Sequence, residues 1–344
     1  MTDLTLSRRG YLSGVGTAGL AGLAGCLGGG NNLNGGGNGL EELSVAYMPI
    51  FPDLQYFVME SKGYFGEIDA GIDGQEFTDG PSIVRAYGGG ELDVAMFGIV
   101  PSMIVVDRGL PAKVTAANVR EPMAIMAHEG LQELWDEHGA EAFDVWERER
   151  GEKFQFGTFP QGSVPDVLLR YWLSEVAGVD PESAVEITEI GGANAVFQAL
   201  VNGEIDGTSI MEPVPTRLGE TDSPVRTFRT AAEVMPGQPA AVTLMSDEVR
   251  ESDLAGQFLE QHVRASEFIE ENPEETAGII EEGIGMDRGL ARQALDGPLS
   301  NFVTDPREIE NGVEIFSEFA RDNGQIDEAL SLDEIFDYSV YDGL

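Results

Sequence analysis

Side chains that could act as nucleophiles or as soft metal ligands are scarce in this chain of 344 residues. Cys26 is the only cysteine, and the only histidines, His128, His138 and His262, lie in unrelated sequence contexts. One cysteine allows neither a disulfide framework nor a cysteine-ligated zinc site. We therefore expect no metal site, no cofactor and no catalytic centre built on histidine or cysteine.

Four turns instead carry residues suited to holding a small molecule. The first contains two prolines and separates a strand expected at 43–47 from a helix expected at 54–62. Its rigid backbone would present aromatic and polar side chains at the start of that helix, although an ordinary loop with a buried Phe has the same pattern. The candidates in this turn are Tyr47, Pro49, Phe51, Asp53 and Gln55.

The second turn opens a helix. Thr78, Asp79 and Gly80 stand directly before Pro81, and proline is common in the first turn of a helix. The unpaired backbone N–H groups at such a start can be capped by the aspartate or can hold an anion. Both interpretations stay open.

The third turn ends in Gln161, Gly162 and Ser163 and precedes a helix expected over 164–177. Ser163 and Asp166 have the spacing of a capping box, so Ser163 could simply satisfy the first N–H groups of the helix. Gly162 would also let a ligand approach the backbone closely, and the helix dipole favours a negative group there. We therefore count all three residues of the turn as binding candidates.

A repeated segment indicates two related halves. The stretch Ala86–Ala95 reads AYGGGELDVA, and the stretch Ala199–Thr208 reads ALVNGEIDGT. Gly90 and Gly203 are 113 positions apart (203 − 90), and the aspartate three residues later keeps the same offset. Each copy predicts a helix closed by glycine, an acidic residue and a strand, a common pattern that can also arise by chance. Strand-like and helix-like segments alternate to about residue 243, which predicts an α/β fold with largely parallel sheets.

The turns after the two repeated strands supply the remaining candidates. Glu212 lies in the fourth turn, Met211-Glu212-Pro213, which follows the second strand, and Phe97 and Gly98 follow the first strand. In open α/β sheets ligands bind outside the carboxyl ends of the strands, so two facing lobes would place both turns on one cleft. A buried carboxylate needs a hydrogen-bond donor, which Glu212 would find either in the ligand or in a protein group.

The first forty residues have the pattern of an export signal followed by a tether. Paired arginines at 8–9 precede a short apolar stretch at 12–24, which resembles a twin-arginine signal peptide. The residues around Cys26 resemble a lipobox, whose cysteine receives a lipid, and the Gly/Asn-rich residues 27–40 predict a flexible tether. We interpret residues 1–26 as the signal and expect attachment to the outer face of the cell membrane through Cys26 alone.

The charge of the chain excludes a nucleic-acid partner. Lys and Arg total 20 against 61 Asp and Glu, and the net charge of −41 repels phosphate backbones and anionic headgroups. The carboxylates are spread along the chain, which resembles proteins of halophiles, where molar salt shortens the Debye length to about 3 Å. The charge indicates habitat rather than ligand.

Together these motifs resemble the nitrate/sulfonate/taurine class of ABC-transporter solute-binding proteins, which also includes thiamine-precursor binders. The resemblance covers nearly the whole mature chain and rests on the order and spacing of its motifs. These are Tyr47-Met48-Pro49, Lys62–Phe65, Gly90–Ala95 with Gly98 and Pro101, Gln161-Gly162-Ser163, Gly203–Asp206 with Glu212-Pro213, and Glu271–Glu274.

The resemblance implies a two-lobed fold like that of periplasmic binding proteins of type II, with a hinge between the lobes. Lobe 1 would comprise residues 41–121 and 245–344, including C-terminal helices packed on it, and lobe 2 residues 122–244. The crossings would lie near 120–123 and 243–249. Asn118, beside the first crossing, joins the ligand-binding candidates.

The function that the resemblance implies is that of a monomeric receptor. It would capture a small polar solute, anionic or zwitterionic, in the cleft and deliver it to a cognate ABC permease. An enzyme on the same bilobal fold, with Asp79 or Glu212 as a general base, is the alternative.

Two features depart from the family pattern. Relatives often carry histidines near the positions of Asp53 and Asp166, and carboxylates there leave room for a cationic or zwitterionic ligand. The stretch 131–153 is longer than a minimal member needs, and we expect Trp135 and Trp146 within it to serve helix packing.

Overall fold

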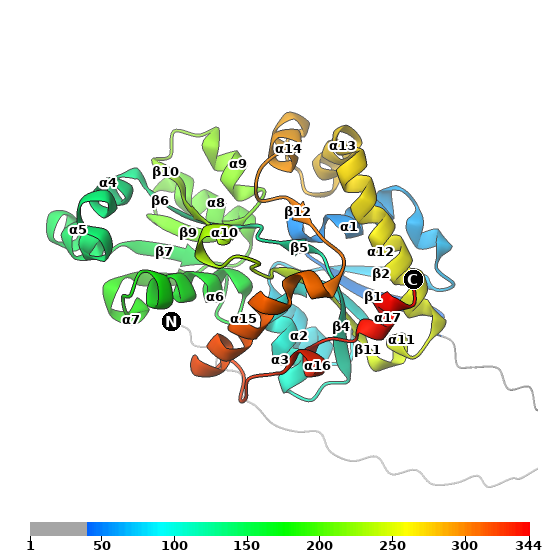
Figure 1. Ribbon diagram of the computed structural model, residues 1–344. Helices are drawn as coiled ribbons and strands as arrows, with labels where there is room; N and C mark the ends of the chain where they lie inside the picture. Colours follow the sequence, from blue (N-terminus) through cyan, green and yellow to red (C-terminus); the bar gives the residue numbers. More distant parts are fainter. Residues whose placement is uncertain (1–39) are drawn as a thin grey trace, which may run out of the picture. The chain divides into compact units, whose positions relative to one another are not determined.

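Two five-stranded sheets organise residues 40–344, the part of the chain that the computed structural model describes (Figure 1). The expected signal, the lipid-attachment residue Cys26 and all of the expected tether but its last residue, position 40, lie outside the described residues. The first sheet has the order β2 (Gly71–Glu76), β1 (Glu42–Tyr47), β3 (Val94–Gly98), β11 (Ala241–Ser246) and β4 (Ala112–Ala117). The second has the order β10 (Val225–Thr230), β6 (Met123–His128), β9 (Gly207–Met211), β7 (Gln155–Thr158) and β8 (Glu186–Glu189).

The two sheets match strand for strand. β1 pairs in parallel with β2 and β3, and β7 pairs in parallel with β8 and β9. In each sheet one antiparallel strand, β11 or β6, then adds to the inner parallel strand and carries a further antiparallel edge strand. The expected α/β fold of two lobes is therefore confirmed, but the sheet of each lobe is mixed and not largely parallel as the sequence predicted.

Equivalent hydrogen bonds hold the repeated segments. Asp93 accepts from the backbone N–H of Ser44 at 2.8 Å, and Asp206 accepts from that of Gln155 at 2.9 Å. Each aspartate thereby joins its strand to the parallel neighbour, β1 or β7. The glycines that close the preceding helices have left-handed backbones, with φ of 73° at Gly90 and 69° at Gly203. Only a residue without a Cβ adopts this conformation freely, which is why both copies carry glycine there.

Helices cover the sheets in each lobe. The first lobe has α1 (Leu54–Ser61), α2 (Gly80–Gly88) and α3 (Ile99–Asp107); the second has α6 (Val164–Tyr171), α7 (Pro181–Ala184), α8 (Ala193–Asn202), α9 (Val214–Gly219) and α10 (Ala231–Val234). A π-helical turn at Trp172–Val176 extends α6, so the expected helix over 164–177 is continuous. Short 3₁₀ turns stand at Phe51–Asp53, Tyr64–Glu67, Gly139–Glu141 and Pro306–Ile309.

Two crossings connect the lobes. The first leaves β4 and passes through β5 (Val119–Arg120), which pairs with β12 (Asn301–Phe302). The second returns before Ala241, because β11 pairs along its length with β3 and β4 of the first sheet. This crossing therefore lies a few residues earlier in the chain than the boundary between 244 and 245 expected from the sequence.

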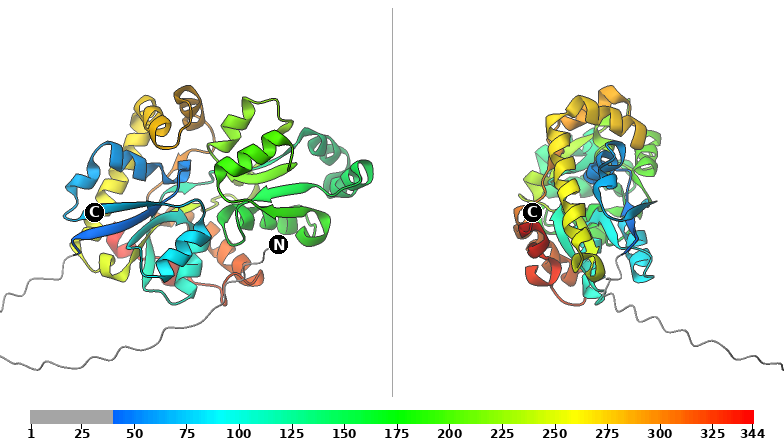
Figure 2. Two further views of the ribbon diagram at one scale, coloured as in Figure 1. Left: turned by 180° about the vertical axis from the view of Figure 1, so that it is seen from behind. Right: turned by 90° about the vertical axis from the view of Figure 1, so that its right-hand side faces the viewer.

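The C-terminal helices lie mainly against the first lobe (Figure 2). They are α11 (Asp247–Arg250), α12 (Asp253–Glu271), α13 (Pro273–Gly283), α14 (Arg288–Leu295), α15 (Glu310–Asp322), α16 (Leu332–Ile335) and α17 (Tyr338–Asp342). α12 and α13 pack on α1, whereas α14 touches α9 and α15 touches α6 of the second lobe. No helix among residues 40–344 has the length and apolar content to cross a membrane.

The long stretch at 131–153 forms a helix pair, α4 (Glu129–His138) and α5 (Ala142–Arg150), on the second lobe. Trp135 lies 5.7 Å from Trp172 between ring centroids, and Trp146 lies 4.9 Å from Phe154. Aromatic contacts of this kind add to the burial of apolar area. The expected packing role of both tryptophans is confirmed.

Candidate functional site

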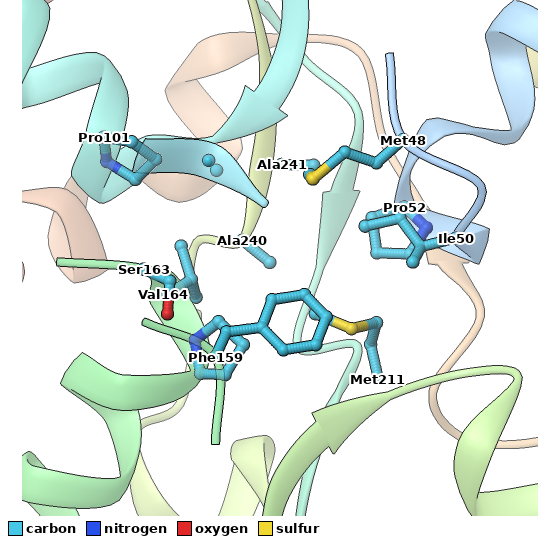
Figure 3. Close-up of a pocket in the computed structure, with 13 residues that line it drawn as sticks. Met48, Ile50, Pro52, Pro101, Phe159, Ser163, Val164, Met211, Ala240 and Ala241 are labelled. Atoms are coloured by element: carbon cyan, nitrogen blue, oxygen red, sulfur yellow. The ribbon is translucent and has the colours of Figure 1, made fainter. Parts of the chain in front are cut away.

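A small cavity lies between the two lobes, where strands of both sheets end (Figure 3). It leaves about 20 Å³ of room, little more than one water molecule needs. A larger solute therefore does not fit the cavity in this arrangement of the lobes. The lining residues are Met48, Ile50, Pro52, Gly80, Gly98, Pro101, Phe159, Ser163, Val164, Pro165, Met211, Ala240 and Ala241.

The first lobe contributes the turn after β1 and the starts of α2 and α3. The carboxylate of Asp53 accepts from the backbone N–H of Met48 at 2.9 Å, which fixes this turn. A Cβ on Gly80 would lie 2.7 Å from Pro101, so only glycine lets α2 and α3 begin this close together. The turn and the two helix starts thus form one continuous wall.

The second lobe contributes the start of α6 and the end of β9. Ser163 caps α6 by accepting from the backbone N–H of Asp166 at 3.4 Å. Asp166 in turn accepts from the backbone N–H of Gly162 at 3.3 Å and from Arg170 at 2.8 Å. Figure 3 shows Phe159 and Met211 of this lobe across the gap from Pro101 and Met48 of the first.

Three helix starts converge on the cavity. Gly80 is the first residue of α2, Gly98 is the N-cap of α3 and Ser163 is the N-cap of α6. Each N-terminus carries a partial positive charge. No lysine, arginine, aspartate or glutamate is among the lining residues. The cavity therefore combines apolar walls with dipoles that favour a negative group.

Of the residues expected to bind ligand, Gly80, Gly98 and Ser163 line the cavity. Thr78 is exposed, and its hydroxyl donates to Asp79, which caps α2 by accepting from the backbone N–H of Ser82 at 2.8 Å. The capping role of Asp79 is thus confirmed, and binding of an anion at this helix start stays a prediction.

The other candidates of the third turn lie beside the cavity. Gln161 is exposed, and its backbone N–H donates to Glu189 at 3.3 Å. Gly162 is buried, with a left-handed φ of 85°. A Cβ at Gly162 would approach Ile104 of α3 to 3.3 Å, so this glycine serves close contact between the lobes.

The remaining aromatic candidates do not line the cavity. Tyr47 is half-buried and stacks on Tyr56, with ring centroids 3.7 Å apart. Phe97 is fully buried in the core, and Phe51 is almost fully buried. The backbone N–H of Phe51 donates across the lobes to the carbonyl oxygen of Glu212 at 3.3 Å. Pro49, partly exposed in the same turn, lies outside the lining.

Three polar candidates belong instead to a buried polar cluster in the first lobe. Its members, each at most 7% exposed, are Asp53, Gln55, Asn118, Thr243, His262 and Ser266. Burial raises the pKa of Asp53 well above its ordinary value, and hydrogen bonds from Met48 and Asn118 only partly offset this. Burial also lowers the pKa of His262 to about 3. Both effects favour uncharged side chains.

Glu212 has a partner within the protein. Its carboxylate accepts from the hydroxyl of Thr216 at 2.8 Å and from the backbone N–H of the same residue at 3.1 Å. Burial raises the pKa of Glu212, and the two bonds from Thr216 oppose the rise. The side chain borders a separate side pocket, of about 320 Å³, between α9, β10 and the segment before β12.

The sequence located the turns that surround the cavity, but it identified only three of the individual residues that line it. Most of the lining residues that it missed, such as Met48, Phe159 and Met211, lie within or next to the four turns identified. Ala240 ends the second crossing and Ala241 begins β11, and two alanines there give no chemical signal. Among the described residues, no group of three or more His, Cys, Asp or Glu side chains could hold a metal ion.

The fold is that of the periplasmic binding proteins. The ligand-binding component of an ABC-type import system from Staphylococcus aureus superposes with a TM-score of 0.72 at 17% identity, covering 88% of this chain and 98% of that one. The nitrate-binding protein NrtA from Synechocystis PCC 6803 superposes with a TM-score of 0.70 at 14% identity, covering 88% of each chain. The alkanesulfonate-binding protein SsuA from Xanthomonas axonopodis pv. citri superposes with a TM-score of 0.68 at 13% identity, covering 86% of this chain and 98% of that one.

The chain belongs to the NMT1-like family, which matches residues 36–282. No curated protein matches it. The resemblance drawn from the sequence motifs is thus confirmed at the level of family and fold.

Proposed function

We propose that this protein is the solute-binding component of an ABC importer and captures a small anionic or zwitterionic solute between its lobes. The observation that carries the proposal is the convergence of three helix starts, from both lobes, on a cavity with no charged lining side chain. A negative group there would be held by backbone N–H groups and by Ser163. The apolar walls would contact the remainder of the solute.

The carboxylates that left room for a cationic ligand in the sequence do not oppose an anion. Asp53 lies in the buried polar cluster, and Asp166 is paired with Arg170. Neither lines the cavity. The two aspartates therefore bond to the protein's own groups, and neither presents its carboxylate to a solute in the cavity.

Capture requires only a change in the equilibrium between open and closed arrangements. A solute that contacts both walls binds the closed form more tightly, and it shifts the equilibrium by that difference in affinity. The permease would recognise the closed form. No bond is broken in this cycle, which fits a cavity without a titratable lining side chain. The enzyme alternative has no specific observation in its favour.

The experiment is a thermal unfolding screen of the purified protein in molar salt. Inorganic anions, sulfonates, amino acids and pyrimidines are added in turn, with inorganic cations as controls. We expect members of one class to raise the melting temperature and to change the fluorescence of Trp172, at the end of α6. If no compound in any class moves either signal, the proposal is wrong.

The proposed location is the outer face of the membrane, through a lipid on Cys26. The name of one solved structure of this fold, a sulphonate-binding protein from Escherichia coli, describes it as periplasmic. Cys26→Ser should release the chain into the medium, whereas Cys26→Ser with both arginines at 8–9 changed to lysine should keep it in the cell. Retention of Cys26→Ser at the cell surface would exclude the anchor.

A further inference from the structure

Glu121, in the first crossing between the lobes, has a left-handed backbone with a φ of 56°. It is the only residue other than glycine with a positive φ among residues 40–344. A Cβ disfavours this conformation, and the residue before a proline, here Pro122, prefers an extended backbone. The conformation of Glu121 therefore persists only because its surroundings hold it, as is common at sites that serve a function.

Contacts with the second crossing hold Glu121. Its backbone N–H donates to the carbonyl oxygen of Gln238 at 2.9 Å, and its carboxylate accepts from the backbone N–H of Gly237 at 2.5 Å. The preceding residue, Arg120, forms an isolated antiparallel bridge with Pro239. A carboxylate is a stronger acceptor than a neutral group, and Glu121 is half-buried, which partly shields its bond from water. Glu121 thus clasps the two crossings together.

The second crossing continues from this clasp to the cavity. Ala240 lines the cavity, and its carbonyl oxygen accepts from the backbone N–H of Ile99, the first residue of α3, at 2.7 Å. The crossing also rests on α15. A Cβ on Gly312 of that helix would lie 2.6 Å from the carbonyl oxygen of Gly237, so only glycine allows this contact. The second crossing is therefore fixed from Gly237, at the clasp, to Ala240, at the cavity wall.

A hinge between two lobes moves by changing backbone dihedral angles at a few residues. Two crossings that are hydrogen-bonded to each other must change together, so the clasp restricts how the lobes can move. We propose that Glu121 is a positioning residue of the binding site, which clasps the two crossings and thereby holds the lobes in the arrangement that encloses the cavity. The consequence for affinity rests on the proposed solute-binding function, whereas the arrangement of the lobes does not.

Three variants of Glu121 separate its side chain from its backbone. Glu121→Ala removes the carboxylate and keeps a Cβ, whereas Glu121→Gln keeps an acceptor oxygen on a side chain of the same length. Glu121→Gly also removes the carboxylate but adopts the left-handed backbone freely, so it should fold even if Glu121→Ala does not. The matched control is Glu308→Ala, which removes the carboxylate that pairs with Arg120 at 3.5 Å and leaves both hydrogen bonds of Glu121 in place.

The first measurement needs no solute. Spin labels are attached to Gln198→Cys on α8 and Glu267→Cys on α12, two exposed positions in different lobes of the full chain, with the native thiol removed by Cys26→Ser. Pulsed electron paramagnetic resonance then gives the distribution of distances between the labels. We expect Glu121→Ala and Glu121→Gly to broaden this distribution, and Glu121→Gln and Glu308→Ala to keep the width of the wild type.

A distribution in Glu121→Gly as narrow as in the wild type would overturn the inference. Equal broadening in Glu121→Gln would also overturn it, because the acceptor oxygen would then be without effect. Equal broadening in Glu308→Ala would do the same, because any lost contact at the crossing would then suffice.

The second measurement is the affinity for the compound that gives the largest thermal shift in the screen. A looser hinge populates the closed arrangement less, and affinity falls with that population. We expect Glu121→Ala and Glu121→Gly to bind about tenfold more weakly, and Glu121→Gln to bind within about threefold of the wild type. Broadened distances in Glu121→Ala and Glu121→Gly alone, with a screen that finds no compound, would support the clasp and contradict only the proposed solute binding.

Discussion

At the scale of single residues, Asp53, a titratable side chain expected to bind ligand, lies in the buried polar cluster and does not line the cavity. Asp53 is the only acid of the buried polar cluster, and no lysine or arginine belongs to that cluster. Burying a carboxyl without a cation favours its protonated form. The side chain was expected to meet a ligand, and its role in the structure is to hold the backbone of Met48.

This burial makes stability depend on pH. The pKa of Asp53 is raised in the folded chain, so its contribution is fully present below the unfolded pKa of about 3.9 and is lost as the pH rises through the folded pKa. Asp53→Asn keeps an acceptor for Met48 but cannot ionise. Between the unfolded and the folded pKa, we expect the free energy of unfolding of the variant to rise relative to that of the wild type by about 1.4 kcal/mol per pH unit. Urea unfolding at a series of pH values measures this, and a difference independent of pH would contradict it.

His262 gives the stability of the protein the opposite dependence on pH. Burial lowers its pKa to about 3, so its contribution is present above the unfolded pKa of about 6.5 and is lost as the pH falls toward 3. The variant His262→Gln cannot gain this charge and should not lose that stability. As the pH is lowered, the free energy of unfolding of the wild type should therefore fall relative to that of the variant by up to about 1.4 kcal/mol per pH unit. Acid titration of the melting temperature tests it. His138→Gln, at an exposed site on α4, is the control, and a parallel course for wild type and His262→Gln would refute the assignment.

At the scale of elements, the cavity is made by starts of helices that approach closely. Gly98, the N-cap of α3, faces α6 of the other lobe. Its φ of −62° and ψ of 143° suit any residue, so the glycine is required by space and not by backbone conformation. A Cβ there would lie 2.9 Å from Val164.

Gly98→Ala should therefore oppose closure. We expect solute affinity to fall by about tenfold or more, since each 1.4 kcal/mol lost from the closed form costs a factor of about ten. Val164→Ala removes the clashing methyl group and should partly restore binding in the double variant. Gly66→Ala, with nothing near its Cβ, is the neutral control. Calorimetric titration gives the affinities; unchanged binding by Gly98→Ala would show that the lobes need not meet here.

The sequence predicted the elements well because their signals are local. The helix starting at Val164 was expected from the spacing of Ser163 and Asp166, and the repeat was expected from two glycines that close helices. The lining of the cavity depends on the approach of distant segments. Asn118 and Ala241 are 123 positions apart (241 − 118) yet share a hydrogen bond, and no local pattern indicates such a pair.

At the scale of the two described lobes, the matching order of strands in the two sheets gives one cavity two similar walls. Each sheet carries the same order of strands, and each repeated strand ends at a turn that contributes to the lining. A single lobe would offer helix starts to open water, where their dipoles are screened. Two facing lobes exclude water and strengthen the attraction for a negative group.

The most direct test of a solute held between the lobes is native mass spectrometry of protein released gently from its cells. We predict a mass increment from one small anionic or zwitterionic molecule, which is lost in Gly98→Ala and returns when the released compound is added to the emptied wild-type protein. A bare chain in every preparation, combined with no binding of any compound in the screen, would contradict the role of the cavity as a solute site.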